Sequence, residues 1–129
     1  MKKEEEREQI ALFEWIGWQG EKLYPELKGI NHYPIGGLRH KAVAAKLKRM
    51  GAKADMPDIH LPVARHGFHS LYIELKAQGG KLRKGQSDML HYLAGQGNYT
   101  VVCVGWESAK DTILDYLGGS NDKCERLEG

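Results

Sequence analysis

The sequence predicts a small α/β domain in which helices cover a mixed β-sheet. Helical periodicity alternates with short apolar or alternating runs, in the order helix, breaker-rich loop, helix, strand, strand, helix, strand, helix. A chain of 129 residues suits one hydrophobic core, so we expect one domain with its core over about residues 5–117 and a polar tail over 118–129. The 41% hydrophobic and 28% charged content is ordinary for a globular protein.

Neither a membrane span nor a disulfide framework is indicated by the sequence. No apolar run approaches the ~20 residues that a spanning helix needs, and residues 1–8 lack the apolar segment of a signal peptide. Cys103 lies in a strand-like run and Cys124 in the polar tail, without the paired spacing of a disulfide or a cysteine zinc site. We therefore expect a cytoplasmic protein that does not contact membranes.

The first predicted element is a helix over residues 4–18 that ends near Gly17 to Gly20. Its acidic first turn suits the positive end of the helix dipole. Its apolar positions recur at helical spacing and are Ile10, Leu12, Phe13 and Ile16. Residues 24–37 contain too many prolines and glycines for a long element and predict only a short strand over about 30–33.

A second helix is predicted over residues 39–50, where good helix formers surround regularly spaced apolar positions and Gly51 is a natural stop. This helix lies in a basic segment, because residues 38–53 contain lysines and arginines but no acid. A second basic segment spans residues 76–84. Such segments can contact phosphates, or they can be solvated surface, and the sequence leaves both interpretations open.

Two strands are predicted over residues 57–63 and 71–77, joined by a polar turn. In the second strand apolar residues alternate with Tyr72, Glu74 and Lys76. The period of two places these three side chains on one face of the sheet.

The remaining chain completes the predicted α/β order. Residues 78–85 form a glycine-rich basic loop that lacks the pattern of a nucleotide-binding loop. A helix over 87–94, a strand over 99–105 and a closing helix over 108–117 follow. Because the run 99–105 is rich in β-branched residues and nearly all apolar, we expect it to be a buried interior strand.

Two acids and a lysine stand where they can converge. Asp58 begins the first strand, and Glu74 and Lys76 lie in the middle of its neighbour. Carboxylates hold Mg²⁺ or Mn²⁺, which can activate water and neutralise charge during phosphodiester hydrolysis, and a nearby lysine can hold that water. The same residues can also form an ordinary cross-strand salt-bridge face.

The ordered set of Pro57-Asp58, Glu74-Leu75-Lys76 and Gln86 resembles the PD-(D/E)XK nuclease motif. With residues 36–48 included, the pattern is similar to the VRR-NUC domain in its short stand-alone phage or prophage form. The resemblance covers roughly residues 5–117. It implies a restriction-endonuclease-like core and an Mg²⁺- or Mn²⁺-dependent DNA endonuclease that hydrolyses phosphodiester bonds.

The resemblance also implies roles for individual residues. Asp58 and Glu74 match the metal-binding acids, and Lys76 matches the catalytic lysine. Gln86 matches the glutamine that supports this lysine or the substrate phosphate.

Further implied site residues lie outside this motif or in its backbone. The first-helix acid of such nucleases matches Glu5, with Glu8 as the alternative, and the Leu75 carbonyl is an expected metal ligand. We expect DNA contacts from residues of the two basic segments, namely Arg39, Lys41, Lys48, Lys81, Arg83 and Lys84.

Small nucleases of this resemblance look like homodimers, and two sites related by a two-fold axis suit a symmetric four-way junction. We therefore expect a homodimer that cuts branched DNA, with Holliday-junction cleavage as the most attractive activity, in the cytoplasm of a bacterial host cell. The alternative function is a non-catalytic nucleic-acid-binding module that uses residues 39–53 and 81–84.

The chain departs from the resembled pattern at two positions. Ile35 stands where the family often has asparagine, before Gly36-Gly37. Asp55 stands where a glycine is usual before Pro-Asp, and it adds a carboxylate that could alter metal binding or repel DNA.

The other residues with metal-binding or base-stacking potential favour ordinary structural roles. Three histidines near the motif lack a fixed metal-ligand spacing and are expected at the surface or in local hydrogen bonds: His60, His66 and His69. Three tryptophans are expected to pack or to form a subunit contact rather than to stack on bases: Trp15, Trp18 and Trp106.

Overall fold

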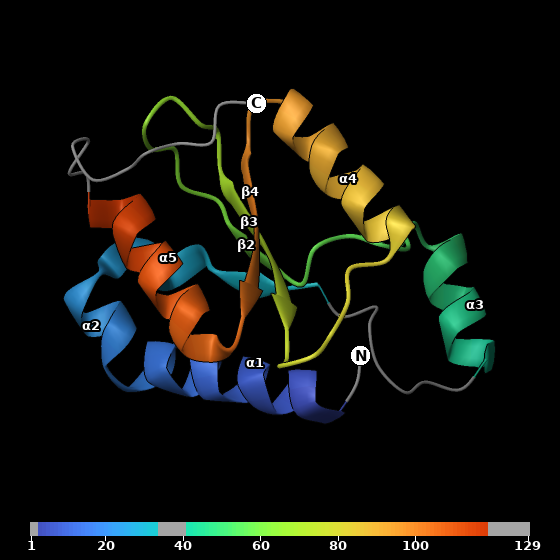
Figure 1. Cartoon of the computed structure of the whole chain (residues 1–129), viewed down its shortest axis with the longest axis horizontal. Coiled ribbons are helices and arrows are strands. Elements are labelled where there is room, and N and C mark those ends of the chain that lie inside the picture. Colours follow the sequence, from blue (N-terminus) through green and yellow to red (C-terminus); the bar gives the residue numbers. More distant parts are fainter. Residues whose placement is uncertain (1–2, 34–40, 119–129) are drawn as a thin grey trace.

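The computed structural model describes residues 3–33 and 41–118 of the chain (Figure 1). Within these residues, one four-stranded sheet has the order β1, β2, β3, β4. The strands are β1 (Asn31–His32), β2 (Ile59–Leu61), β3 (Leu71–Lys76) and β4 (Tyr99–Val104). The pairs β1–β2 and β2–β3 are antiparallel, whereas β3 and β4 are parallel, so the predicted mixed sheet is confirmed.

Helices flank this sheet, as the fold class predicts (Figure 1). The helical segments are α1 (Lys3–Trp15), a π-helical turn (Ile16–Gly20), α2 (Glu21–Leu23), a 3₁₀ turn (Pro25–Gly29), α3 (Lys41–Arg49), α4 (Lys84–Gly95) and α5 (Trp106–Gly118). Among the described helices, none combines the length and the apolar character that crossing a membrane requires.

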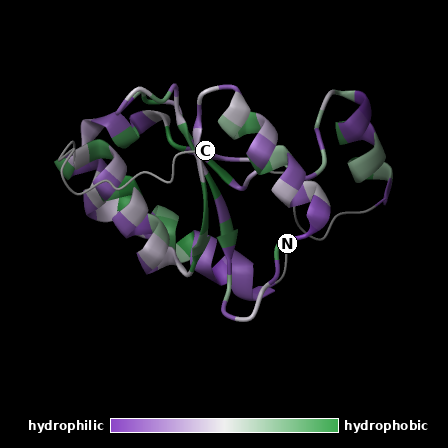
Figure 2. Ribbon diagram, turned by 45° about the horizontal axis from the view of Figure 1, so that its top comes forward, coloured by the Kyte–Doolittle hydropathy of each residue, from purple (hydrophilic) through white to green (hydrophobic). Residues whose placement is uncertain are grey.

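The main core lies between the sheet and the helices α1 and α5. On β3, Leu71, Ile73 and Leu75 are fully buried and belong to one apolar cluster with Leu12 of α1 and Ile113 of α5. Full burial of a leucine or isoleucine stabilises a fold by about 1.5–3 kcal/mol. Figure 2 shows this arrangement as hydrophobic residues on the central strands and a hydrophilic N-terminal part of α1. The apolar half of the β3 alternation therefore anchors the strand.

The opposite face of β3 carries the polar half of the alternation. Helix α4 lies on this side, since Gln86 in its first turn hydrogen-bonds with both Glu74 and Lys76. The sheet thus separates an apolar layer, formed with α1 and α5, from a polar face bordered by α4.

The prediction that residues 99–105 form an interior strand is wrong. Within the described sheet, β4 is an edge strand that pairs with β3 on one side. Val102 and Val104 are 40% and 48% exposed, whereas Cys103 between them is buried. Helix α4 is the crossover connection that brings β4 parallel to β3. No described strand pairs with the other side of β4. The apolar run therefore reflects β-propensity rather than burial on both faces.

Helix α3 forms as predicted over Lys41–Arg49, although the predicted residues 39 and 40 lie outside the described chain. None of the residues of α3 is buried. Figures 1 and 2 show the helix at the periphery of the molecule, outside the N-terminal end of α4. Its regularly spaced apolar side chains therefore do not contribute to the main core.

Two helices begin earlier than their patterns predict. Helix α4 begins at Lys84 rather than Ser87, because the Gln86 side chain accepts a 3.0 Å hydrogen bond from the Arg83 N–H and caps the first turn. Helix α5 begins at Trp106 rather than Ser108, because Glu8 of α1 accepts a 2.8 Å hydrogen bond from the Trp106 N–H. Both starts depend on a side chain that satisfies an end-of-helix N–H group.

Candidate active site

Asp58 lies just before β2 and is held by three hydrogen bonds. Its backbone carbonyl accepts from the Tyr33 N–H at 2.8 Å and from His32 Nδ1 at 2.9 Å. Its side-chain Oδ2 accepts from the Leu75 N–H at 2.8 Å. The carboxylate is therefore fixed beside β3, opposite Glu74 in the extension of the β2–β3 register.

Glu74 and Lys76 follow each other on the polar face of β3. Both residues are buried, and Lys76 Nζ lies 3.8 Å from Glu74 Oε2. Glu74 Oε1 is a buried oxygen without a hydrogen-bond partner among the described residues. A buried, unpartnered carboxylate oxygen is costly, so this atom indicates a position that a ligand would satisfy.

Gln86 connects these two side chains to helix α4. Its Oε1 accepts a 3.0 Å hydrogen bond from Lys76 Nζ, and its Nε2 donates a 3.2 Å hydrogen bond to Glu74 Oε2. The same Oε1 also accepts from the Arg83 N–H. One buried amide therefore orients the lysine and the glutamate and caps the helix.

The electrostatic surroundings of Glu74 disfavour its charged form. Burial raises the pKa of Glu74 to about 8, and the neighbouring Asp58 and the more distant Glu5 reinforce the rise, while Lys76 opposes it. The negative charges of Asp58, Glu74 and Glu5 are thus not fully compensated by the positive charge of Lys76.

The residues present fit a divalent cation. A cation between Asp58 and Glu74 would satisfy Glu74 Oε1 and would offset the carboxylate repulsion. In the described parts of the chain, no group of three or more His, Cys, Asp or Glu side chains could hold a metal ion. The cation would therefore also need oxygen ligands from a backbone carbonyl and from water. Mg²⁺ commonly keeps several of its water ligands when it binds to a protein.

The two acids of α1 lie in different surroundings. Glu5 is buried and is close enough to Glu74 to contribute to its raised pKa. Glu8 Oε1 instead accepts the hydrogen bond from the Trp106 N–H at the start of α5. The geometry therefore places Glu5, and not Glu8, on the side of the candidate site.

The expected DNA-binding residues lie in two places, with Arg39 outside the described residues. Lys41 and Lys48 are exposed on α3, and Lys81, Arg83 and Lys84 are exposed around the start of α4. The second group directly precedes Gln86, so it lies next to the acidic site. Lys84 also forms a 2.8 Å ion pair with Asp88.

Asp55 has a partner that the sequence did not reveal. It forms a 3.3 Å ion pair with Arg83, and its backbone has a φ of 67°, a left-handed conformation that aspartate adopts more readily than most residues other than glycine. Its carboxylate lies against Gly85, where an added Cβ would stand 2.8 Å from Asp55 Cγ. The structure therefore places this departure from the family pattern at the start of α4, where it holds one of the expected DNA-binding residues.

Local contacts engage the three histidines near the motif. His66 Nε2 bonds to the Tyr116 carbonyl at 2.9 Å, and the His69 N–H donates to the Gly97 carbonyl at 2.9 Å. His60 stacks on Tyr72, and burial lowers the pKa of His60 and raises the pKa of Tyr72. The sequence pattern did not mark the His60–Tyr72 pair, because the register that joins the two residues is decided by strand pairing.

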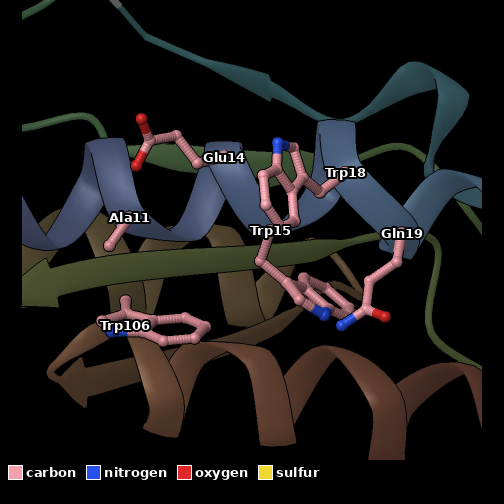
Figure 3. A pocket seen from close by; sticks show the side chains of 6 residues that line it. All are labelled: Ala11, Glu14, Trp15, Trp18, Gln19 and Trp106. Carbon is pink, nitrogen blue, oxygen red and sulfur yellow. The ribbon is translucent and has the colours of Figure 1, made fainter.

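A tryptophan-lined hollow of about 380 Å³ lies between α1 and α5, away from Asp58 and Glu74 (Figure 3). Figure 3 shows Trp15 and Trp106 facing the space between the helices, with Trp18 projecting from the π-helical turn. Trp18 is 83% exposed. Lys110 Nζ lies 5.5 Å from the ring centroid of Trp15 and 5.9 Å from that of Trp106.

Comparisons with known proteins agree with this arrangement. The VRR-NUC domain model matches residues 4–106, which include every acid and lysine of the candidate site. A solved structure named as a VRR_NUC domain protein is 31% identical, with a TM-score of 0.74 over 92% of this chain and 91% of that chain. The search of curated proteins found no match. The chain therefore belongs to the VRR-NUC domain family, a family of nuclease-type modules that act on DNA.

Proposed function

We propose that this chain is an Mg²⁺- or Mn²⁺-dependent DNA endonuclease that cuts branched DNA, with Holliday junctions as the preferred substrate. One observation carries the proposal. Glu74 is buried beside Asp58 with one carboxylate oxygen unpartnered among the described residues, while Lys76 lies 3.8 Å from the other oxygen. An ordinary salt-bridge face would not leave a buried acid in this state.

The roles follow from the positions of the side chains. Asp58, Glu74 and the Leu75 carbonyl would hold the cation, with Glu5 as an outer acid. When bound, the cation supplies charge neutralisation and a more acidic water. Lys76 donates from Nζ toward the attacking water or the phosphate, and Gln86 keeps that ammonium in place.

The basic residues near the site would position the DNA. Lys81, Arg83 and Lys84 precede the buried Gln86, so phosphates that reach them also approach the acids. Exposed cations of α3 would extend this surface. Such contacts supply binding without sequence preference, which suits recognition of DNA shape.

We also propose that the chain acts as a homodimer through the surface around the hollow that Trp15, Trp18 and Trp106 line, here called the tryptophan face. Ile10, Trp18 and Leu23 are large exposed apolar residues on the first helical segments, next to the hollow of about 380 Å³. A two-fold axis through this face would place Trp18 of each copy in the hollow of the other. Because Glu14 and Gln19 line the hollow and acids are frequent on α1, this face is better suited to a protein than to DNA.

Cleavage assays test the proposed activity. The chain should nick a four-way junction with Mn²⁺ faster than a flap or a linear duplex, and chelation should abolish cutting. Asp58→Asn and Lys76→Ala should lose at least about a hundredfold in rate, because the first weakens cation binding and the second removes the ammonium that donates toward the attacking water or the phosphate. The matched controls are Asp111→Asn and Lys22→Ala, which change exposed residues of α5 and α2.

Each outcome has a clear meaning. Equal cutting of all three substrates would refute junction preference, and full activity of both site variants would refute the site. If no substrate is cut but DNA binding depends on Lys48 and Lys81, the chain is a binding module. Calorimetry adds a second readout, since Mn²⁺ binding should disappear in Glu74→Ala.

A further inference from the structure

A second pair of side chains lies one step along the sheet from the candidate site. His60 and Tyr72 are direct partners in the β2–β3 register, and their rings stack with centroids 4.2 Å apart and an interplanar angle of 11°. They lie two residues from Asp58 and Glu74, respectively, on the same polar face. Two residues along a strand correspond to about 6.6 Å.

A chain of hydrogen bonds anchors His60 from the side away from the acids. Asn98 Nδ2 donates to the Leu93 carbonyl at 3.0 Å, which orients the amide so that its Oδ1 accepts from the Ser70 hydroxyl at 2.7 Å. The Ser70 hydroxyl has then used its hydrogen. Its 3.1 Å contact with His60 Nε2 therefore requires His60 to donate.

This anchoring exceeds what simple packing requires. Ser70 is buried, and Asn98 connects this series of hydrogen bonds to the C-terminal part of α4. The His60 ring is thereby held in one orientation, and the stacked Tyr72 ring is held against it. Tyr72 itself is only partly buried, and no described residue forms a hydrogen bond with its hydroxyl.

We propose that Tyr72 binds the DNA phosphate one or two nucleotides from the scissile phosphate, donating from its hydroxyl to a non-bridging oxygen, and that His60 is the positioning residue for this contact. Successive nucleotides of one strand rise by about 3.4 Å along the helix axis, and their phosphates lie further apart than this because the strand winds around the axis. A group about 6.6 Å from the acids is therefore within reach of a phosphate next to the scissile one or the phosphate after it. The proposal rests on the proposed function, because it takes Asp58 and Glu74 as the position of the scissile phosphate.

DNA with one neutral methylphosphonate at a chosen position tests the contact directly. Tyr72→Phe keeps the stacked ring and removes only the hydroxyl, so it should raise KM at least about tenfold on ordinary DNA and leave kcat nearly unchanged. A methylphosphonate at one of the two neighbouring positions should raise KM of the wild type by a similar factor. Combining the two changes should give no further rise, because both remove the same hydrogen bond.

Two further variants separate contact from packing. His60→Phe keeps a stacked ring but loses the Ser70 hydrogen bond, so its KM should rise by a smaller factor than that of Tyr72→Phe, and the same methylphosphonate should raise its KM by less than it raises that of the wild type. Tyr24→Phe, on the core side of the sheet, should match the wild type on every substrate.

The outcomes are distinguishable. If the wild type cuts ordinary DNA but Tyr72→Phe has an unchanged KM, or if its effect adds fully to that of every methylphosphonate, the contact proposal is wrong. If the wild type cuts no DNA with Mn²⁺, the proposed function fails and this proposal fails with it.

Discussion

Gln86 Oε1 accepts a 3.0 Å hydrogen bond from Lys76 Nζ, which couples the start of helix α4 to the catalytic lysine proposed on β3. The other end of the same amide donates to Glu74. The site is thus built from a strand and the helix that follows it in the chain, joined by one buried side chain. Replacing Gln86 should therefore lower activity and stability more than replacing an exposed glutamine does.

Gln86→Leu should lower kcat by about ten- to a hundredfold and leave KM nearly unchanged. The change removes the hydrogen bonds of the Gln86 amide with the buried Lys76 ammonium and with one Glu74 oxygen. Each buried polar group left without its partner costs about 1–3 kcal/mol of free energy. Steady-state cleavage kinetics measure the effect, and thermal unfolding should show a lower Tm. Gln96→Leu at the exposed end of α4 is the control, and equal effects of the two variants would contradict the bridging role.

Glu74→Gln should raise the stability of the metal-free protein, and the gain should grow between about pH 4.5 and pH 8. The folded pKa of about 8 lies above the ordinary value of 4.5, so the folded state keeps a proton that the unfolded state loses in this window. Rising pH therefore destabilises the wild type by up to about 1.4 kcal/mol per pH unit, and glutamine removes this dependence.

Unfolding in a chelator at pH 5 and pH 8 measures the difference between the two proteins. Saturating Mn²⁺ should reverse the order at pH 8, because the cation stabilises only the protein that retains Glu74. A wild type whose stability relative to Glu74→Gln is the same at both pH values would contradict the raised pKa.

Glu5→Gln should lose most cleavage activity, whereas Glu8→Gln should retain it. Glu5 is buried and acts electrostatically on Glu74. Glu8 instead accepts a hydrogen bond from the Trp106 N–H at the start of α5, and a glutamine oxygen at this position can still accept it. Cleavage rates with Mn²⁺ compare this matched pair on one helix. The reverse result, with Glu8→Gln inactive and Glu5→Gln active, would assign the first-helix acid to Glu8.

Gly85→Ala should displace the Asp55 carboxylate and its Arg83 ion pair, and this loss should offset the ~1 kcal/mol that alanine contributes over glycine inside a helix. Gly95→Ala is the control on the same helix, because no atom lies within 4 Å of an added Cβ there. Asp55→Gly should restore the stability of Gly85→Ala, since it removes the carboxylate and also suits a φ of 67°. Thermal unfolding checks all three, and a Tm that rises as much in Gly85→Ala as in Gly95→Ala would contradict the close approach.

Trp18→Ala should weaken the proposed dimer by roughly 30-fold, because truncating a buried tryptophan at an interface costs about 2 kcal/mol or more. Light scattering after size-exclusion chromatography over a dilution series measures the dissociation. Tyr92→Ala removes an exposed aromatic from α4 and should not change the mass. If the wild type is monomeric, or if Trp18→Ala dimerises normally, the tryptophan face is not the interface.

The sequence by itself determined the local elements and the acids that carry the expected chemistry. Alternation on residues 71–77 predicted one face for Glu74 and Lys76, and α4 and β1 lie close to their predicted ranges. These features depend on periods of two and 3.6 residues, which neighbouring residues encode without reference to the rest of the fold. The motif spacing likewise marked Asp58 and Gln86 as members of one site.

Only the tertiary structure decided which segments meet. An apolar pattern does not say whether a strand lies inside a sheet or at its edge, and β4 is an edge strand because of the α4 crossover. The resemblance matched Glu5 to the first-helix acid and kept Glu8 as the alternative, and only the tertiary structure shows Glu8 bound to the start of α5. The ion pair of Asp55 with Arg83 and the stack of His60 on Tyr72 join residues from different elements. Such contacts depend on strand register and helix placement, which are set by packing of the whole core rather than by local sequence.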